Sequence, residues 1–441
     1  MKKVFTAVVS ILTAIAVSCL CACAVAESDL LGAPKKTTPL THEERLDAGL
    51  ADMVLGANAF SYDFSEQAYS SYSGSGNLAV TPLSVYMALS VAAECAQGDT
   101  RSEILSALNT TYGNLKENFS KLYRSVIFED ISHEGQLSGR LDVTNSIWLN
   151  SGIQDFNAND KCISSLADNF FCYSYAADFT NSNRNANKAL REFTAEKTKG
   201  LIDRDFGISE RTSFLLVNTL YLHDIWNMYG DELRFVDGKH NFTAGDGTKK
   251  EVRYLQGRYL SGRTYEDEAF TSFYTRTYHG CKIKFILPRD GYSISDVFTA
   301  DNIKTINTLD DYNGYDGENR IYYYTRCFFP EFGGGFDGDV KDVLKKGFGI
   351  RSMFDPDASD FSAVSDAKNY CSEVRHTVNL KVTKKGIEGA AVTVLDVAGA
   401  APPPDEDYTE VYEDFIVDRA FGYVVTNSDD VVLFAGVVDN I

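Results

Sequence analysis

The segment 386–404 constrains the fold of this chain more than any other part of its sequence. From 389 to 398 it lacks clusters of turn-forming residues. Read at a period of two, one face over residues 387–397 carries no charge, and the opposite face carries Glu388 and Asp396. This pattern is typical of a half-buried β-strand. A proline-rich, acidic stretch follows directly, so a strand-forming sequence is joined to an exposed loop and can lie inside or outside a sheet.

Helical patterns dominate the first half of the chain, and strand patterns the second. Thr81 and Pro82 provide an N-cap and a first-turn proline before an apolar run that ends at Ala93. Residues 100–103 read as a capping box, and residues 186–197 as an amphipathic helix. Strands are predicted at residues 215–222, 281–287, 322–329, 377–382, 421–425 and 431–438. Helices followed by strands, without βαβ alternation, predict an α+β fold.

The composition excludes several classes of protein. The chain has 42 basic and 62 acidic residues, a net charge of −20 and a pI near 4.7, which argue against binding to a nucleic-acid backbone. Its mean hydropathy of −0.20 and its single long apolar run exclude a polytopic membrane protein. No linker divides residues 45–441, so we expect them to form one domain. No nucleophile elbow or phosphate loop is found, and we expect no enzyme activity and no cofactor.

The one long apolar run begins the chain and predicts an export signal over residues 1–22. Within it, residues 20–23 resemble a bacterial lipobox, in which the thiol of Cys23 is lipidated and becomes the mature N-terminus. Cleavage after Ala26 by an ordinary signal peptidase is the alternative. Residues 23–44 are expected to be a tether, which places the protein outside the cell or on its surface.

Six further cysteines are too widely spaced for a Cys-x-x-Cys metal site, and we expect most of them to be free and buried. They are Cys95, Cys162, Cys172, Cys281, Cys327 and Cys371. The six histidines include no pair at metal-binding spacing, and no metal is expected.

Short motifs along the chain form an ordered set with the stretch from His376 to Thr393. They lie at residues 77–84, 144–148, 197–202, 217–221, 329–332, 348–350, 360–362 and 433–438. Their content and order resemble the serpin family over nearly the whole mature chain. The resemblance implies an α+β, serpin-like fold of three β-sheets and eight or nine helices, with an exposed reactive-centre loop over residues 386–414.

The resemblance also implies roles for individual residues. The hinge of the loop would be Gly386, Ile387, Glu388, Gly389, Ala390, Ala391, Val392 and Thr393. The shutter and breach, where the sheet opens, would include Thr81, Ser84, Asn218, Trp226 and His376. Counting the family's usual hinge length from Gly386 places the scissile bond between Ala400 and Ala401. Ile387 departs from the family, which usually has Thr or Ser there, and Lys384 makes the entrance to the hinge basic.

The resemblance further implies that the protein inhibits a serine protease as a suicide substrate. The protease forms a covalent acyl-enzyme with the loop, and the cut loop inserts into the sheet before the protease is released. Ala400 favours an elastase-like protease. Cleavage after Asp396 would leave a short inserted strand, and cleavage after Tyr408 would force three prolines into the sheet.

A non-inhibitory serpin-fold protein, which acts in binding or structure and is cleaved as a plain substrate, is the alternative function. In either case we expect a monomer with no nucleic-acid partner. Contact with a membrane is expected only through a lipid at the N-terminus.

Overall fold

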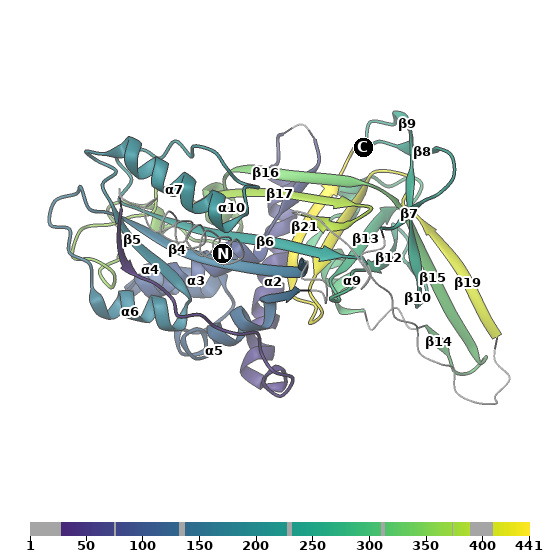
Figure 1. Cartoon of the computed structure of the whole chain (residues 1–441), viewed down its shortest axis with the longest axis horizontal. Coiled ribbons are helices and arrows are strands. Elements are labelled where there is room, and N and C mark those ends of the chain that lie inside the picture. Colours follow the sequence, from purple (N-terminus) through teal and green to yellow (C-terminus); the bar gives the residue numbers. More distant parts are fainter. Residues whose placement is uncertain are drawn as a thin grey trace, which may run out of the picture.

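The computed structural model describes residues 28–74, 76–131, 137–226, 232–309, 314–372, 374–388 and 409–441. Within these ranges the chain forms nine α-helices and three β-sheets, which confirms the predicted α+β fold (Figure 1). The helices are α2 (Ala48–Ser71), α3 (Pro82–Cys95), α4 (Gly98–Ala107), α5 (Tyr112–Val126), α6 (Asp160–Asn169), α7 (Asn183–Lys197), α8 (Ile294–Val297), α9 (Ala300–Thr308) and α10 (Lys341–Gly347). None of these helices is both long and apolar enough to cross a bilayer.

The largest sheet has fourteen strands within the described residues, and it contains the start of the segment 386–404. In spatial order its strands are β1 (Asp29–Gly32), β5 (Cys172–Ala177), β4 (Leu137–Asn150), β6 (Phe214–Ile225), β18 (Gly386–Glu388), β17 (Arg375–Thr383), β16 (Phe332–Asp339), β2 (Leu78–Val80), β21 (Val432–Val438), β20 (Phe421–Thr426), β13 (Lys282–Pro288), β12 (Phe270–Arg276) and β11 (Tyr265–Glu266). The fourteenth strand, β3 (Phe128–Ile131), pairs with β4 and lies outside this linear order. The closing hairpin of β20 and β21 is buried along its whole length, as its apolar sequence predicted.

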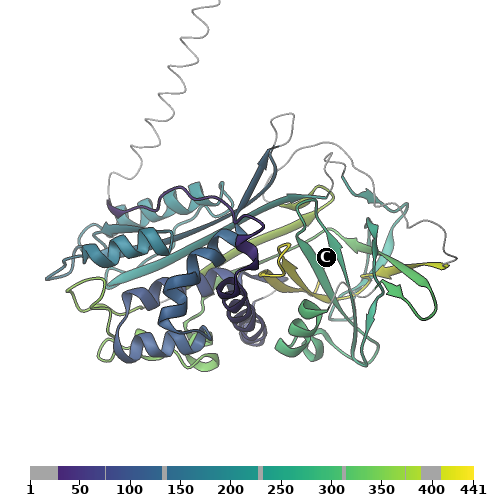
Figure 2. The same ribbon diagram turned by 90° about the horizontal axis from the view of Figure 1, so that it is seen from below.

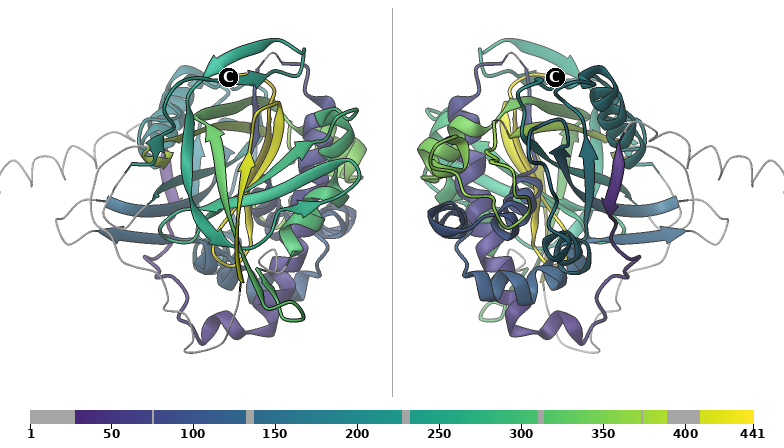
Figure 3. Two further views of the ribbon diagram at one scale, coloured as in Figure 1. Left: turned by 90° about the vertical axis from the view of Figure 1, so that its right-hand side faces the viewer. Right: turned by 90° about the vertical axis from the view of Figure 1, so that its left-hand side faces the viewer.

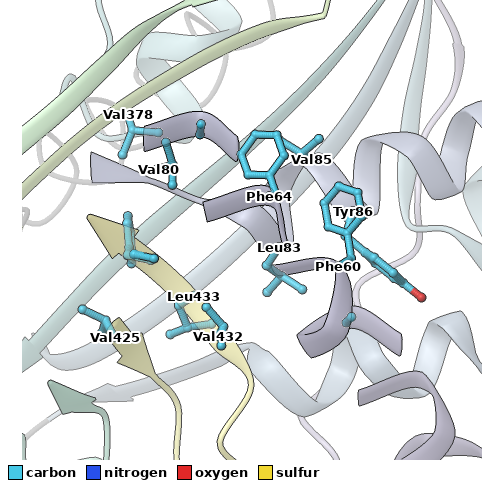
Figure 4. Packing of buried hydrophobic residues seen from close by; sticks show 14 of the residues in the cluster. Phe60, Phe64, Val80, Leu83, Val85, Tyr86, Val378, Val425, Val432 and Leu433 are labelled. Carbon is cyan, nitrogen blue, oxygen red and sulfur yellow. The ribbon is translucent and has the colours of Figure 1, made fainter. Parts of the chain in front are cut away.

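Helices cover both faces of one half of this sheet (Figure 2). α3 packs against β6 and β21, and all of its residues are buried, as expected of a helix that is apolar all round. Its Tyr86 joins Phe60 and Phe64 of α2 and Val378 of β17 in one core (Figure 4). On the opposite face α7 packs over a second, smaller cluster that includes Trp148. Near the predicted shutter, the sheet is therefore covered by α3 on one face and by α7 on the other.

A second sheet of five strands extends from the other end of the molecule (Figures 1 and 3). Its strands are β14 (Tyr315–Asp316), β15 (Ile321–Pro330), β10 (Tyr254–Ser261), β7 (Arg234–Phe235) and β19 (Thr409–Ile416). β19 pairs in parallel with β15 along its full length. The predicted reactive-centre loop, residues 386–414, is therefore too long at its end, because hydrogen bonds to β15 hold residues 409–414 in a strand. The third sheet is the hairpin of β8 (His240–Thr243) and β9 (Lys249–Val252).

Residues 28–44 are not a free tether, so the prediction for residues 23–44 is wrong over this part. β1 pairs antiparallel with β5 at the edge of the large sheet. Further along, the backbone N–H of Leu40 donates to the carbonyl of Arg124, and the Leu40 side chain is buried. β1 contains no proline, and as an edge strand it needs hydrogen bonds along one side only.

We expect Leu40→Ala to lower the free energy of unfolding by about 2–3 kcal/mol, because it empties a buried site in this docked segment. Leu46→Ala is the matched control. The Leu46 side chain is 77% exposed, so its loss should change the free energy by less than about 0.5 kcal/mol. Denaturant-induced unfolding measures both variants. Equal effects of the two substitutions would show that Leu40 contributes nothing to the domain.

The capping box predicted at residues 100–103 is not formed. The hydroxyl of Thr100 instead accepts a hydrogen bond from the backbone N–H of Asp360 at 3.0 Å. The carboxylate of Glu103 accepts from the backbone N–H of Ser352 at 2.7 Å. Both side chains bind segments that are distant in the sequence, so tertiary contacts replace the local cap.

All six cysteines outside the signal region are buried, and none of them is joined to another in a disulfide, as expected for most of them. Burial raises the pKa of the thiols of Cys95, Cys172, Cys281 and Cys327. In the described part of the chain, no group of three or more His, Cys, Asp or Glu side chains is placed to hold a metal ion.

Candidate functional site

The short strand β18 places the start of the segment 386–404 inside the large sheet. It pairs antiparallel with β6 on one side and with β17 on the other. Ile387 lies between Asp224 of β6 and Val382 of β17, and its side chain is fully buried. The first residue of the predicted uncharged face therefore points into the core.

Gly386 can begin this strand because it has no side chain. Its φ is +152°, a conformation that L-residues with a Cβ rarely adopt. A Cβ built on Gly386 would lie 2.1 Å from the carbonyl oxygen of Asp224, which is backbone and cannot move aside. Any larger residue would therefore strain this backbone and force β18 or β6 to shift.

Beyond β18 the two neighbouring strands are not joined. Over the described residues, no hydrogen-bond ladder connects β6 directly to β17. A cavity of about 20 Å³, room for about one water molecule, is lined by Ser84, Asn218 and Leu220 among others. Ser84 Oγ and Asn218 Oδ1 are buried and make no hydrogen bond within this described part. The space between β6 and β17 thus leaves unsatisfied polar groups that an additional strand could cover.

His376 lies at the end of β17 that is far from β18, and it anchors the strand. Its Nε2 accepts a hydrogen bond from the backbone N–H of Thr81 at 3.1 Å, at the start of α3. Its ring packs 6.0 Å from the ring of Phe64 and 5.6 Å from that of Phe336. Burial lowers the pKa of His376 to about 3, so the imidazole is neutral in the folded protein.

Trp226 lies at the hinge end of the opening, where it connects the end of β6 to the last residue of β17. Its Nε1 donates to the carbonyl of Thr383 at 2.7 Å, and its ring packs 5.8 Å from the ring of Phe329. Next along the chain, Lys384 forms an ion pair with Glu232. The basic charge predicted at the entrance to the hinge is therefore balanced by an acidic partner.

Sequence reasoning missed a buried acidic group in this region. Asp224 of β6 is 0% exposed and accepts hydrogen bonds from Thr277 Oγ1 at 2.5 Å and from His279 Nδ1 at 2.7 Å. The other ring nitrogen of His279 lies 3.0 Å from Asp130 of β3. Burial acts to lower the pKa of His279, but its hydrogen bonds and its charge interactions with the two aspartates raise it overall. The ring of His279 thereby ties the hinge end of β6 to β3.

We expect these two histidines to give the stability opposite dependences on pH. The pKa of His376 is lowered on folding, so its contribution is complete above about pH 6.5 and is lost as the pH falls toward about 3. The pKa of His279 is raised, so its contribution is complete below about pH 6.5 and is lost as the pH rises through the folded value. Thermal unfolding from about pH 4 to 9 should show that His376→Gln flattens only the acid side and His279→Gln only the alkaline side. Profiles parallel to the parent's would contradict both assignments.

The structure brings most of the predicted shutter residues together. Around the opening between β6 and β17 lie Thr81, Ser84, Asn218 and His376, with Trp226 at its hinge end. The hinge residues Gly386, Ile387 and Glu388 form β18. The other predicted sites lie outside the described residues: Gly389, Ala390, Ala391, Val392 and Thr393 of the hinge, the bond between Ala400 and Ala401, and Cys23.

Comparison with known proteins points to the same family as the motifs in the sequence. Residues 55–441 match the family model described as "Serpin (serine protease inhibitor)". The chain is 26% identical over 414 residues to the putative serpin-Z6C of Oryza sativa subsp. japonica, across 88% of this chain and 97% of the relative. It is 26% identical over 379 residues to serpin B7 of Homo sapiens, across 83% of this chain and 93% of that protein.

Solved structures share the fold at lower identity. The native state of tengpin, a thermophilic serpin, aligns with a TM-score of 0.71 at 20% identity, covering 94% of this chain and all of tengpin. Human thyroxine-binding globulin aligns with a TM-score of 0.70 at 18% identity, covering 89% of this chain and 99% of the globulin. These two structures establish the likeness of the fold.

Proposed function

The chain belongs to the serpin family, and from that premise we propose that it inhibits a serine protease as a suicide substrate. The members of this family generally inhibit proteases and do not catalyse a reaction of their own. One observation carries the proposal: β18 already lies between β6 and β17, and beyond it these two strands have no ladder of their own in the described part of the chain. An inserting strand would continue the pairing that β18 has already begun with both neighbours.

The register of β18 indicates where the following residues would go. Both of its pairings are antiparallel, so each step forward along the loop is a step back along β6 and along β17. Thr393 would then lie between Asn218 and His376, beside the cavity. Val397 would lie opposite Phe214, the first residue of β6. The uncharged face of the segment therefore matches the length of β6 that is free to accept it.

The chemistry of inhibition would belong to the protease. Its serine oxygen attacks the carbonyl carbon of Ala400, and the bond to the nitrogen of Ala401 breaks as the protease's histidine gives that nitrogen a proton. The protease stays attached to Ala400 as an ester, and it is carried along when the freed segment inserts. The three prolines at residues 402–404 would mark the end of the insertable segment. The small side chain of Ala400 suits the shallow primary pocket of an elastase-like protease.

The alternative is a serpin-fold protein that is cleaved without trapping the protease. Two features favour it. Ile387 is already buried in the sheet, which shortens the part of the hinge that remains to be inserted. Gly389 also weakens the tendency of the next residues to form a strand.

Incubation with pancreatic elastase distinguishes the two functions. A complex that survives SDS, with the mass of the protease plus the fragment that ends at Ala400, is the result we expect. Complete cleavage of the loop without such a complex would contradict inhibition and support the alternative. Mass spectrometry of the released C-terminal peptide would locate the cleaved bond.

We also propose that the chain is exported and held at the cell surface by a lipid on Cys23. The support is the lipobox-like sequence at residues 20–23. Cys23→Ala should move the protein from the membrane fraction to the medium. Parent protein found free in the medium with an N-terminus at Glu27 would support ordinary secretion.

A further inference from the structure

Aromatic and apolar side chains cover the outer face of the five-stranded sheet. The parallel register of β15 and β19 sets Tyr324 beside Tyr412, Arg326 beside Asp414, and Phe328 beside Ile416. On the other side of β15, Tyr259 of β10 lies opposite Arg326. We call this set the tyrosine face: Tyr259, Tyr324, Arg326, Phe328, Tyr412 and Ile416. The residues between them on β15, Thr325 and Cys327, are buried against the body.

The tyrosine face is ordered by contacts among its own members. The Tyr412 ring lies 5.3 Å from the Tyr324 ring and 5.0 Å from the Tyr259 ring. The guanidinium of Arg326 lies 4.5 Å from the centroid of the Tyr259 ring and forms an ion pair with Asp414 at 3.0 Å. Because the rings hold one another in place, little side-chain entropy would be lost when a partner covers them.

Three of these side chains are exposed to solvent, and Tyr324, Arg326 and Phe328 are half-buried between them. Tyr412 is 56% exposed, Ile416 50% and Tyr259 40%. The solvent face of an antiparallel or mixed sheet is normally polar, so a run of tyrosines there is not explained by folding. Tyrosine and arginine are the residues that dominate the binding energy of protein interfaces. The position of this face beside the loop indicates its partner.

We propose that the tyrosine face is a docking surface for the target protease, beside the subsites that bind residues after the scissile bond. The inference rests on the proposed function. β19 continues the loop directly, and Thr409 is eight residues after Ala401, a span of at most about 29 Å. A protease of about 230 residues has a radius of gyration of about 17 Å. A protease on Ala400 and Ala401 is therefore held within reach of β19.

The charge around the tyrosine face indicates what kind of protease would bind there. Glu410 and Asp414 point outward from β19 beside the rings, and both are exposed. Arg326 is paired with Asp414, so these two charges balance and Glu410 supplies the net negative charge beside the rings. The chain as a whole carries −20. The complementary partner is a protease with a basic surface around that side of its cleft, which opposite charges would steer into contact.

The test compares Tyr412→Ala and Tyr259→Ala with the parent in reactions with a basic elastase. Tyr292→Ala is the control, since Tyr292 is 39% exposed but lies in the turn after β13. We expect the second-order rate constant for complex formation to fall at least about tenfold in each face variant and less than twofold in the control. The number of inhibitor molecules used per protease should not change, because insertion follows docking. Unchanged melting temperatures would show that the variants fold.

The outcomes separate this inference from the proposed function. If no SDS-stable complex forms with the parent, inhibition fails, and kcat/KM for cleavage of the loop then reports docking by the same variants. Rate constants within twofold of the parent in both face variants would overturn the docking surface. Self-association of the parent in sedimentation that is lost in Tyr412→Ala would also overturn it and assign the face to a second copy of the chain.

Discussion

Cutting the loop between Gly399 and Pro402 should raise the temperature of unfolding by at least about 10 °C. The uncut sheet has no ladder between β6 and β17 beyond β18 in its described part, and it holds two buried polar atoms there without partners. Insertion would add hydrogen bonds along both strands and would bury the uncharged face of the segment. For a chain of 441 residues, a rise of 10 °C corresponds to roughly 9 kcal/mol.

The measurement is differential scanning calorimetry before and after a nick made by a non-target protease at catalytic concentration. The control is a nicked protein that carries Thr393→Arg, whose loop should stay out of the sheet and whose unfolding temperature should stay near that of the uncut parent. A nicked parent that melts at or below the temperature of the uncut parent would refute the proposed strain in the native fold.

Thr393→Arg should convert the inhibitor into a substrate. The extended register of β18 sets this position between Asn218 and His376, next to a cavity of about 20 Å³. A guanidinium there would be buried without a carboxylate partner, at a cost of several kcal/mol. Insertion would then be slower than hydrolysis of the acyl-enzyme. The protease would be released in active form, and the loop would be left cut.

Ala390→Arg is the matched control for this substitution. In the same register Ala390 lies between Asn379 of β17, which is exposed, and Tyr221 of β6, which is buried. Its side chain would be on the face away from the cavity, where an arginine can reach water past Asn379. SDS gels and titration of residual protease activity measure both variants. We expect the inhibitor consumed per protease to rise at least about tenfold in Thr393→Arg and less than about threefold in Ala390→Arg. Similar values for the two variants would contradict the assignment of the inserting face.

The sequence was most informative where local pattern and tertiary environment agree. The alternating strand up to Thr383 and the closing buried hairpin were predicted because period-two alternation and continuous apolar runs have few other solutions. The helix from Pro82 was predicted by its N-cap and its apolar run. The uncharged face of the segment after Gly386 was also predicted, and Ile387, its first residue, is buried.

The sequence was least informative where a residue binds a partner far along the chain. β1 has no alternation, and it forms a strand only because the edge of β5 accepts it. Thr100 and Glu103 fit a local cap in sequence but bind distant backbone N–H groups. His279 meets Asp224 across 55 residues, and no spacing rule joins them. That β18 already lies within the sheet likewise depends on the distance between β6 and β17, which no local pattern encodes.

The opening between β6 and β17 should receive the cut loop as a strand. A crystal structure of the protein nicked after Ala400 tests this most directly. We expect residues 387–397 to form one strand, paired with β6 along its whole length and with β17 as far as residue 394, with Thr393 beside Asn218 and His376. A structure of the nicked protein in which β6 and β17 remain unjoined beyond β18, with those residues outside the sheet, would contradict the account.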